Sequence, residues 1–488
     1  MTDDRILELM DLAVATAEKS VPEDKRIHPK VGAVLAREDG ELLLAIFRNY
    51  DGNGNHGEHC LFAEARRLGV DVRGCTLFVT LEPCTRRGVG KTPCAVQVAQ
   101  SGIKRIYIGT LDPNPHITGR GESFLLPYLE VERFPYSKQK VLFKANQAFF
   151  DQHRHEHIPA VSLRTDEETP GANPQLLAGQ REGILQQTME LMTGSQGSIW
   201  IMAGRLSWLR ELQLALVLAA MRGREIRLLC SVPEADPQDF SSLQRVASAS
   251  GCAVAIGPDL FSTRFTLTEP RSSKAAMIAV EEAPALHALM FKSPHEKGLL
   301  ESAAMLFEQN WERSRNLAKA QYPKWVPLSE GEVIAALQRG VPCYAGARFS
   351  LQRIPLDATR PLSGALERLK LARLRVLEIL LREYGVPRLG VIEQSPWPII
   401  PPVVEAQADR TLVVIDGAHR VYTALERGEE QLEAIIVEGV SAPLPAERRP
   451  NWDGVKVLTP KLPRAQRYQG YAEAHFRPIS DALSALRR

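Results

Sequence analysis

The chain has 488 residues, of which 44% are hydrophobic and 24% charged, and its formal net charge is +2 at pH 7. These values are typical of a soluble globular protein of about three domains, and they indicate no strongly polyanionic partner. Seven cysteines are few and odd in number, which favours a reduced cytoplasmic protein over a disulfide framework. We expect neither a signal peptide nor a membrane span, because no apolar run is long enough.

The first 157 residues alternate helix and strand signals. Asp3 or Asp4 could cap a first helix with apolar residues at helical spacing. The dipeptide Asp39-Gly40 is typical of a hairpin turn, here between strands over residues 30–36 and 42–47. Periodicity, β-branched runs and end signals predict the later helices and strands over residues 58–68, 76–81, 94–100, 103–110 and 137–157.

The same region contains the residue types of a zinc deaminase: an H-x-E, then a Pro-Cys, then a second Pro-Cys. His56, Cys84 and Cys94 are the predicted zinc ligands, since three protein ligands leave one position for water. Zinc acidifies bound water toward neutral pKa. Glu58 lies two residues past the histidine, so it could take the water proton and deliver protons to a ring nitrogen and the departing amine.

Two alternatives remain open at this point. If His59 were the ligand instead of His56, the residue two positions further would be Leu61, and no acid–base glutamate would exist. We favour His56 because it keeps the histidine and the glutamate together. A structural zinc site would need a fourth ligand, for which His59, Cys60 and Cys75 are candidates.

Residues 1 to about 155 resemble the diaminohydroxyphosphoribosylaminopyrimidine deaminases of the riboflavin pathway, within the cytidine deaminase-like superfamily. The resemblance implies a three-layer α/β fold, a zinc cofactor and hydrolysis of the exocyclic amine of a pyrimidine-type nucleotide or related aminopyrimidine. Nine residues separate the two ligand cysteines, more than the P-C-x-x-C spacing of cytidine deaminases. The matching segments are PKVGAV at 29–34, the H-x-E, TLEPC at 80–84, TPC at 92–94, DPNP at 112–115 and the G-x-G at 119–121.

The resemblance also implies where the substrate binds. A residue before the first strand lies near the base, an amide ends the second strand, the loop between the cysteines is cationic, and the DPNP turn lines the ribose-phosphate side. Each position has a structural alternative as a turn residue, a surface amide or a solvated loop charge. The candidate substrate-binding residues are His28, Asn49, Arg86, Lys91, Asp112 and Asn114.

Residues 174–316 follow a polar linker and alternate strand and helix signals, which favours an α/β layer with a parallel sheet. Helices are expected over 177–192, 206–221, 240–250 and 302–312. The rhythm is similar to the phospholipase D-like fold of TrmB-type transcription regulators. The H-x-K of that superfamily is absent, so we expect a non-catalytic domain that binds a ligand or a partner, with DNA among the candidates.

Residues 328–488 contain a Leu- and Arg-rich helix over 366–384, whose arginines we expect to form a solvated face. Further on, a strand ends in D-G-A-H-R at the start of a helix. This resembles the D-G-x-H-R of the ParB/sulfiredoxin-like fold and implies a nucleotide phosphate held by the helix start. The alternative is a structural turn with a salt-bridged arginine. The residues concerned are Asp416, Gly417, His419 and Arg420.

The sequence thus predicts a homo-oligomeric α/β protein with a zinc-dependent deaminase at 1–157, a phospholipase D-like domain at 174–316 and a ParB/sulfiredoxin-like domain at 328–488. The last two would regulate the first or bind nucleotides. The reductase domain that normally accompanies such a deaminase is not apparent, so nicotinamide-dependent reduction is not predicted. The competing hypothesis is a non-catalytic, nucleotide-sensing or DNA-associated regulator.

Overall fold

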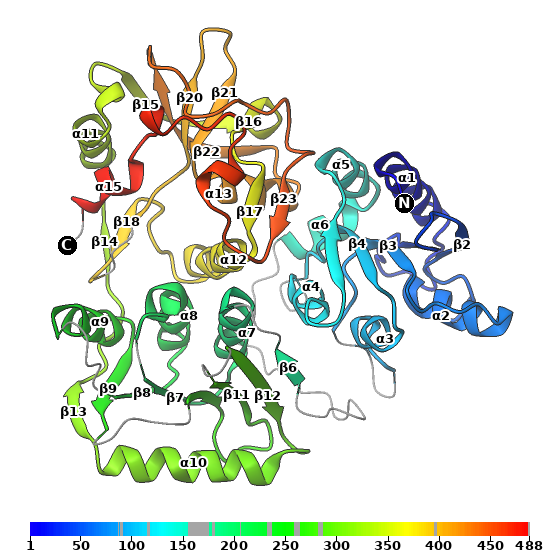
Figure 1. The fold of residues 1–488 in the computed structure, drawn as a ribbon, viewed down its shortest axis with the longest axis horizontal. Helices are drawn as coiled ribbons and strands as arrows, with labels where there is room; N and C mark the ends of the chain where they lie inside the picture. Colours follow the sequence, from blue (N-terminus) through cyan, green and yellow to red (C-terminus); the bar gives the residue numbers. More distant parts are fainter. Residues whose placement is uncertain are drawn as a thin grey trace.

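The computed structural model of the protein describes residues 1–85, 87, 91–114, 118–154, 175–177, 181–204, 206–231, 237–257, 264–281, 286–394 and 398–486. Figure 1 shows three groups of strands and helices that follow one another along the chain. The predicted α/β class is confirmed. Within the described ranges, no helix is long and apolar enough to cross a membrane.

The N-terminal unit is built on a five-stranded sheet in the order β2-β1-β3-β4-β5. Strand β1 pairs antiparallel with both β2 and β3, and β3, β4 and β5 run parallel to one another. The strands are β1 (Gly32–Ala36), β2 (Leu42–Phe47), β3 (Thr76–Leu81), β4 (Arg105–Thr110) and β5 (Glu130–Arg133). The ends of β3 and β4 therefore lie next to each other at one edge of the sheet.

Helices cover both faces of this sheet, which gives three layers. Alternate strand residues point to opposite faces, so each face contributes to a separate apolar core. One core lies under α2 (Gly57–Leu68), α3 (Cys94–Gln100) and α4 (Arg120–Leu125). The other lies under α1 (Asp3–Ala17) and α5 (Tyr136–Ala145).

The single helix predicted over 137–157 is two helices, α5 and α6 (Gln147–Arg154). Asn146 lies between them and uses its side chain to pair with the backbone before β1. Its Oδ1 accepts from Lys30 N at 2.6 Å and its Nδ2 donates to Lys30 O at 3.2 Å. The last three predicted helix positions lie outside the described residues.

The middle unit is an eight-stranded sheet in the order β13-β9-β8-β7-β10-β11-β12-β6. The three neighbours β7, β8 and β9 are parallel, as the alternation of strands and helices predicted, and the remaining strand pairs are antiparallel. The strands are β6 (Gln175–Leu177), β7 (Ile199–Ala203), β8 (Ile226–Cys230), β9 (Cys252–Ile256), β10 (Arg264–Thr268), β11 (Ala276–Glu281), β12 (His287–Lys292) and β13 (Arg315–Ala318).

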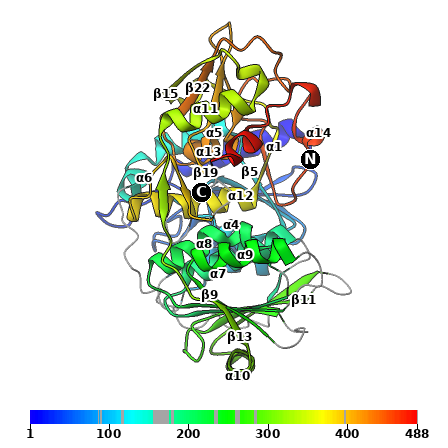
Figure 2. The ribbon, with the colours of Figure 1, turned by 90° about the vertical axis from the view of Figure 1, so that its left-hand side faces the viewer.

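Three helices cover one face of this sheet and a single helix covers the other, as Figure 2 shows. They are α7 (Arg181–Gly194), α8 (Leu209–Met221) and α9 (Pro237–Ala249) on one side and α10 (Lys297–Glu312) on the other. Leu177, where the first of these helices was predicted to begin, belongs to an edge strand instead, and α10 begins at Lys297, five residues before its predicted start at 302.

The C-terminal unit has a five-stranded sheet in the order β15-β22-β20-β21-β16, with smaller sheets β14-β18-β19 and β17-β23 beside it. Its strands are β14 (Trp325–Pro327), β15 (Arg348–Pro355), β16 (Thr359–Pro361), β17 (Ala365–Glu367), β18 (Gly390–Ile392), β19 (Pro398–Ile399), β20 (Val403–Ala406), β21 (Leu412–Asp416), β22 (Gln431–Glu438) and β23 (Lys456–Leu458). Its helices are α11 (Glu330–Gly340), α12 (Arg368–Glu383), α13 (Ala418–Glu426), α14 (Arg464–Arg467) and α15 (Ile479–Ser484).

Helix α12 lies where the three units meet (Figure 1). Its residues Leu369, Ala372, Val376 and Leu380 belong to the same apolar core as α7 and α8 of the middle unit. The expectation of a solvated arginine face holds for Arg382, whose side chain is 54% exposed, but it is wrong for Arg368. Arg368 is only 3% exposed and donates to the backbone oxygens of residues 131 and 457, because both flanking surfaces of the helix are covered by other units.

Candidate metal centre

Three side chains that are far apart in sequence meet at the edge of the N-terminal sheet. His56 immediately precedes α2, Cys84 follows β3, and Cys94 is the first residue of α3. The Nδ1 atom of His56 is 3.5 Å from the sulfur of each cysteine. One donor atom from each residue lies within 4.8 Å of the others, which is close enough for all three to bind one metal ion.

The donor set fits zinc, which accepts imidazole nitrogen and thiolate sulfur together. Both sulfurs are buried, and Cys94 is fully inaccessible. Within the described part of the chain, no fourth His, Cys, Asp or Glu joins this group. Three protein ligands are typical of a catalytic zinc site, whereas structural sites are closed by four.

The alternative ligands considered from the sequence point elsewhere. The Nδ1 atom of His59 is 3.1 Å from the side-chain nitrogen of Gln97. The thiol of Cys60 donates to Asn55 O, and the thiol of Cys75 donates to the backbone oxygen of residue 71. The geometry therefore groups His56, not His59, with the two sulfurs.

Glu58 lies in the first turn of α2, beside the cluster, and is 3% exposed. Burial raises the pKa of its carboxyl group because the charged form loses its hydration. The two cysteines are electrostatically coupled. A hydrogen bond from Cys94 and the nearby His56 lower the pKa of the Cys84 thiol to about 4, and the same contact with Cys84 raises the pKa of Cys94.

A second buried glutamate, which the sequence did not single out, organises the loop opposite the cluster. The carboxylate of Glu82 accepts the backbone N–H groups of Asp112, Gly119 and Glu122 at 3.2, 2.9 and 3.0 Å. Burial raises the pKa of this carboxyl group to about 7. The signal that could have identified it is a charged residue directly after an apolar strand and before Pro-Cys.

A glycine makes this arrangement fit. A Cβ atom at Gly121 would lie 2.0 Å from Pro83 O, so only glycine lets α4 start against the backbone that leads to Cys84. The second glycine of the G-x-G at 119–121 therefore permits this close backbone approach.

Two of the six candidate substrate-binding residues follow β4 in this loop. Asp112 is 6% exposed, its Oδ1 accepts the N–H of Asn114 at 2.8 Å, and burial raises its pKa to about 6. Asn114 is half-buried, and Lys91 is exposed shortly before Cys94. Arg86 lies outside the described residues.

The polar side-chain atoms of His28 and Asn49 instead bind other groups of the N-terminal unit. The Nε2 atom of His28 is 2.8 Å from Asp24, and its Nδ1 is 3.2 Å from the guanidinium of Arg48. Both ends of the Asn49 amide are used by the backbone: Oδ1 accepts from Gly54 N at 2.7 Å and Nδ2 donates to the oxygen of residue 21 at 2.9 Å.

The four C-terminal candidates lie at the start of α13. Gly417 precedes the helix with φ of 85°, a left-handed conformation that favours glycine. Arg420 donates to the carboxylate of Asp416 at 2.8 Å, and the Nε2 of His419 accepts the N–H of Glu367 at 2.9 Å. Burial and neighbouring cations lower the pKa of His419.

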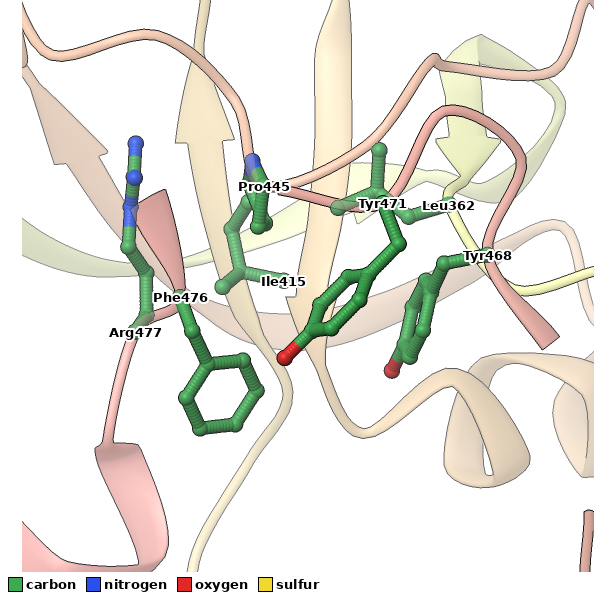
Figure 3. A pocket seen from close by; sticks show the side chains of 7 residues that line it. All are labelled: Leu362, Ile415, Pro445, Tyr468, Tyr471, Phe476 and Arg477. Carbon is green, nitrogen blue, oxygen red and sulfur yellow. The ribbon is translucent and has the colours of Figure 1, made fainter. Parts of the chain in front are cut away.

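Aromatic residues pack beside this motif without opening a ligand pocket (Figure 3). Tyr468 and Tyr471 stack with ring centroids 5.8 Å apart, and the cavity that they line with Ile415 has a volume of about 10 Å³. A cavity of this volume holds about one water molecule, so no nucleobase fits between these rings.

Comparison with known proteins finds similarity to zinc-dependent deaminases in the N-terminal region. Residues 3–110 match the family model of the cytidine and deoxycytidylate deaminase zinc-binding region. The match and the His/Cys/Cys geometry together confirm the predicted zinc cofactor and the resemblance of the N-terminal residues.

Individual relatives match the same deaminase region. Riboflavin biosynthesis protein RibD of Aquifex aeolicus is 41% identical over 95 residues, 19% of this chain and 25% of that protein. Diaminohydroxyphosphoribosylamino-pyrimidine deaminase of Buchnera aphidicola subsp. Schizaphis graminum is 34% identical over 99 residues, 20% of this chain and 63% of that protein. The chain thus spans about a quarter of the first relative's length.

A crystal structure of a diaminohydroxyphosphoribosylaminopyrimidine deaminase/5-amino-6-(5-phosphoribosylamino)uracil reductase from Thermotoga maritima is 18% identical. The similarity covers 59% of this chain and 99% of that chain, with a TM-score of 0.28, which supports no conclusion about the remaining residues. The resemblances of the middle and C-terminal units stay predictions.

The metal centre makes a prediction about zinc content. Purified wild-type protein is expected to carry about one zinc per chain, and Cys94→Ala to carry almost none, because removing one thiolate leaves too few ligands. His59→Asn is the matched control, since this neighbouring imidazole lies outside the cluster. Elemental analysis by mass spectrometry measures both. Zinc loss in His59→Asn with retention in His56→Asn would contradict the assignment.

Proposed function

We propose that the chain is a zinc-dependent deaminase that hydrolyses the exocyclic amine of a pyrimidine-type nucleotide or a related aminopyrimidine. The observation that carries the proposal is a buried carboxylate, Glu58, in the first helical turn after His56 and beside both sulfurs. A closed structural zinc site has no use for such a group, and burying a carboxylate without a role is costly.

The roles of the residues follow from their placement. His56, Cys84 and Cys94 hold the zinc, which supplies the Lewis acidity that makes water nucleophilic near neutral pH. Glu58 accepts a proton from the water that attacks the ring carbon and passes protons to the ring nitrogen and to the departing amine. The carbon–nitrogen bond breaks, ammonia leaves, and the ring carbon keeps the water oxygen as a carbonyl.

The substrate class follows from the surroundings of the centre. Asp112 and Asn114 offer polar atoms on the loop after β4, and Lys91 offers a cation before α3 for a phosphate. A phosphoribosylated aminopyrimidine, of the kind named for the Buchnera relative, combines these features. We assign His28 and Asn49 to positioning the segment before His56, because their polar atoms already bind protein groups.

Replacing Glu58 tests the proposal. Glu58→Gln keeps the shape of the side chain but removes its proton transfer, so ammonia release should fall by about 100- to 10,000-fold. Zinc content should stay at the wild-type value. The assay couples ammonia release to a chromogenic or fluorescent reporter across a panel of pyrimidine nucleotides and phosphoribosyl aminopyrimidines.

Glu64→Gln is the matched control on the same helix, because this carboxylate forms an ion pair with Arg67 away from the cluster. The proposal fails if wild-type protein with zinc bound releases no ammonia from any member of the panel, or if Glu58→Gln is as active as wild type. Nucleotide binding without turnover would support the regulator hypothesis instead.

We also propose that the C-terminal unit binds a nucleotide phosphate at the start of α13. Two features favour this: the first turn of α13 has no side-chain cap, and Arg420 lines a cleft of about 1210 Å³ between α5–α6 and the C-terminal sheet. That volume exceeds the space a nucleotide needs. Lys140 and Arg353 add positive charge to the cleft, whereas Arg427 is paired with Glu378 and Glu429.

The C-terminal proposal predicts separable effects. Arg420→Ala should abolish nucleotide binding at this unit, measured by isothermal titration calorimetry, while ammonia release stays at the wild-type rate. Arg348→Ala, an exposed arginine of β15 outside the cleft, is the matched control. Unchanged nucleotide affinity in Arg420→Ala would contradict this assignment and leave the deaminase proposal standing.

A further inference from the structure

A side chain of the C-terminal unit touches the loop that lines the metal centre. Arg375, on α12, lies against Gly119, the residue that precedes α4. A Cβ atom at position 119 would be 2.2 Å from Arg375 Nη1, so the guanidinium rests directly on the glycine Cα. The N–H of this same glycine donates to Glu82. Arg375 thus contacts the residue whose N–H donates to the carboxylate of Glu82.

Charged side chains from all three units surround the contact between Arg375 and Gly119. The N-terminal unit supplies Glu82 and Glu122, the middle unit supplies Glu190, and α12 supplies Arg375. Burial and the nearby guanidinium of Arg133 lower the pKa of Arg375, and the three carboxylates act in the opposite direction. The Nη2 atom of Arg375 is buried and has no hydrogen-bond partner among the described residues. Arg375 therefore acts on this loop through its positive charge and through its van der Waals contact with Gly119.

Neighbouring contacts hold the same loop and helix. Arg133 and Arg368 both form ion pairs with Glu122, the third residue of α4, and Arg133 also pairs with Glu426 of α13. From the middle unit, Gln187 donates to the Oγ of Ser123 at 2.6 Å. Arg133 pairs with Glu122 inside the N-terminal unit, and docking of the other two units adds the pair with Arg368 and the hydrogen bond from Gln187. Because buried charges and polar groups are costly when their partners are removed, undocking would disturb the start of α4.

We propose that Arg375 is a positioning residue of the deaminase site: α12 of the C-terminal unit fixes the loop of residues 111–114 and 118–122 against the metal centre. This inference rests on the proposed deaminase function. The guanidinium covers Gly119, whose N–H donates to Glu82, and Glu82 in turn accepts the N–H of Asp112. Activity then depends on a residue more than 250 positions away from the zinc ligands.

The test compares three full-length variants with wild type. Arg375→Met keeps an unbranched apolar stem but removes the guanidinium and its charge, and Arg375→Lys restores a charge without the planar head. Arg382→Met is the matched control on the solvent side of the same helix, where the side chain is 54% exposed. Ammonia release gives kcat and KM, elemental analysis gives zinc, and amide hydrogen exchange reports on peptides spanning residues 108–126.

We expect Arg375→Met to lower kcat/KM by about 10- to 100-fold, as a loop displaced by a fraction of an ångström would. Zinc content should be unchanged, and amide exchange should accelerate in the loop peptides but not in those of β1 and β2. Millimolar guanidinium ion and Arg375→Lys should each restore part of the rate. Arg382→Met should behave as wild type.

Wild-type kcat, KM and loop exchange in Arg375→Met would overturn the inference. If that variant does not fold, Gly119→Ala displaces the guanidinium from the other side and also strains the loop backbone at φ of 75°. Normal kinetics in Gly119→Ala would overturn the inference equally. A wild-type protein that releases no ammonia would sink the deaminase proposal alone, since the exchange measurement needs no turnover.

Discussion

A single buried carboxylate holds the candidate centre in shape. Glu82 accepts three backbone N–H groups from a loop and a helix start that no strand pairing would otherwise fix. Leaving such donors unpaired in the interior costs about 1–3 kcal/mol each, so the loop after β4 is strongly tied to the end of β3. The same short segment carries Cys84, and therefore the metal ligand and the opposite wall of the site move together.

The buried charges at the junction explain why the three units are packed in one arrangement. Ion pairs inside proteins add little net stability, but separating their partners leaves uncompensated charges and is strongly unfavourable. Glu122 is fully inaccessible and bound by arginines of two units, which keeps the pKa of its carboxyl group far below the usual value. The middle and C-terminal units are consequently packed against the deaminase region, and α12 contacts both the middle unit and the N-terminal unit.

The metal-binding residues could be predicted from the sequence because zinc binding depends on a few residue types in recognisable short motifs. His56, Cys84 and Cys94 stand at strand ends and helix starts whose signals are local, and the helix over 94–100 was predicted with its observed bounds. The break at Asn146 was not predictable, because its cause is a pair of hydrogen bonds to Lys30, more than a hundred residues earlier.

Long-range docking accounts for the remaining differences. The arginines of α12 have the spacing of a solvated face, and only contact with Glu122 and Gly119 makes Arg368 and Arg375 interior residues. Glu82 was missed for the same reason, since its three donors come from a distant loop. The pairing of β12 with β11 and β6 likewise depends on contacts that periodicity does not encode.

The central claim is that water, activated at the centre of His56, Cys84 and Cys94, replaces an exocyclic amine. The most direct measurement is mass spectrometry of the product formed in ¹⁸O-labelled water from the best substrate of the panel. The account predicts that the substrate loses its amine and that the new carbonyl carries one ¹⁸O atom from solvent. A product without solvent oxygen, or an amine that is retained while nucleotide is bound, would contradict it.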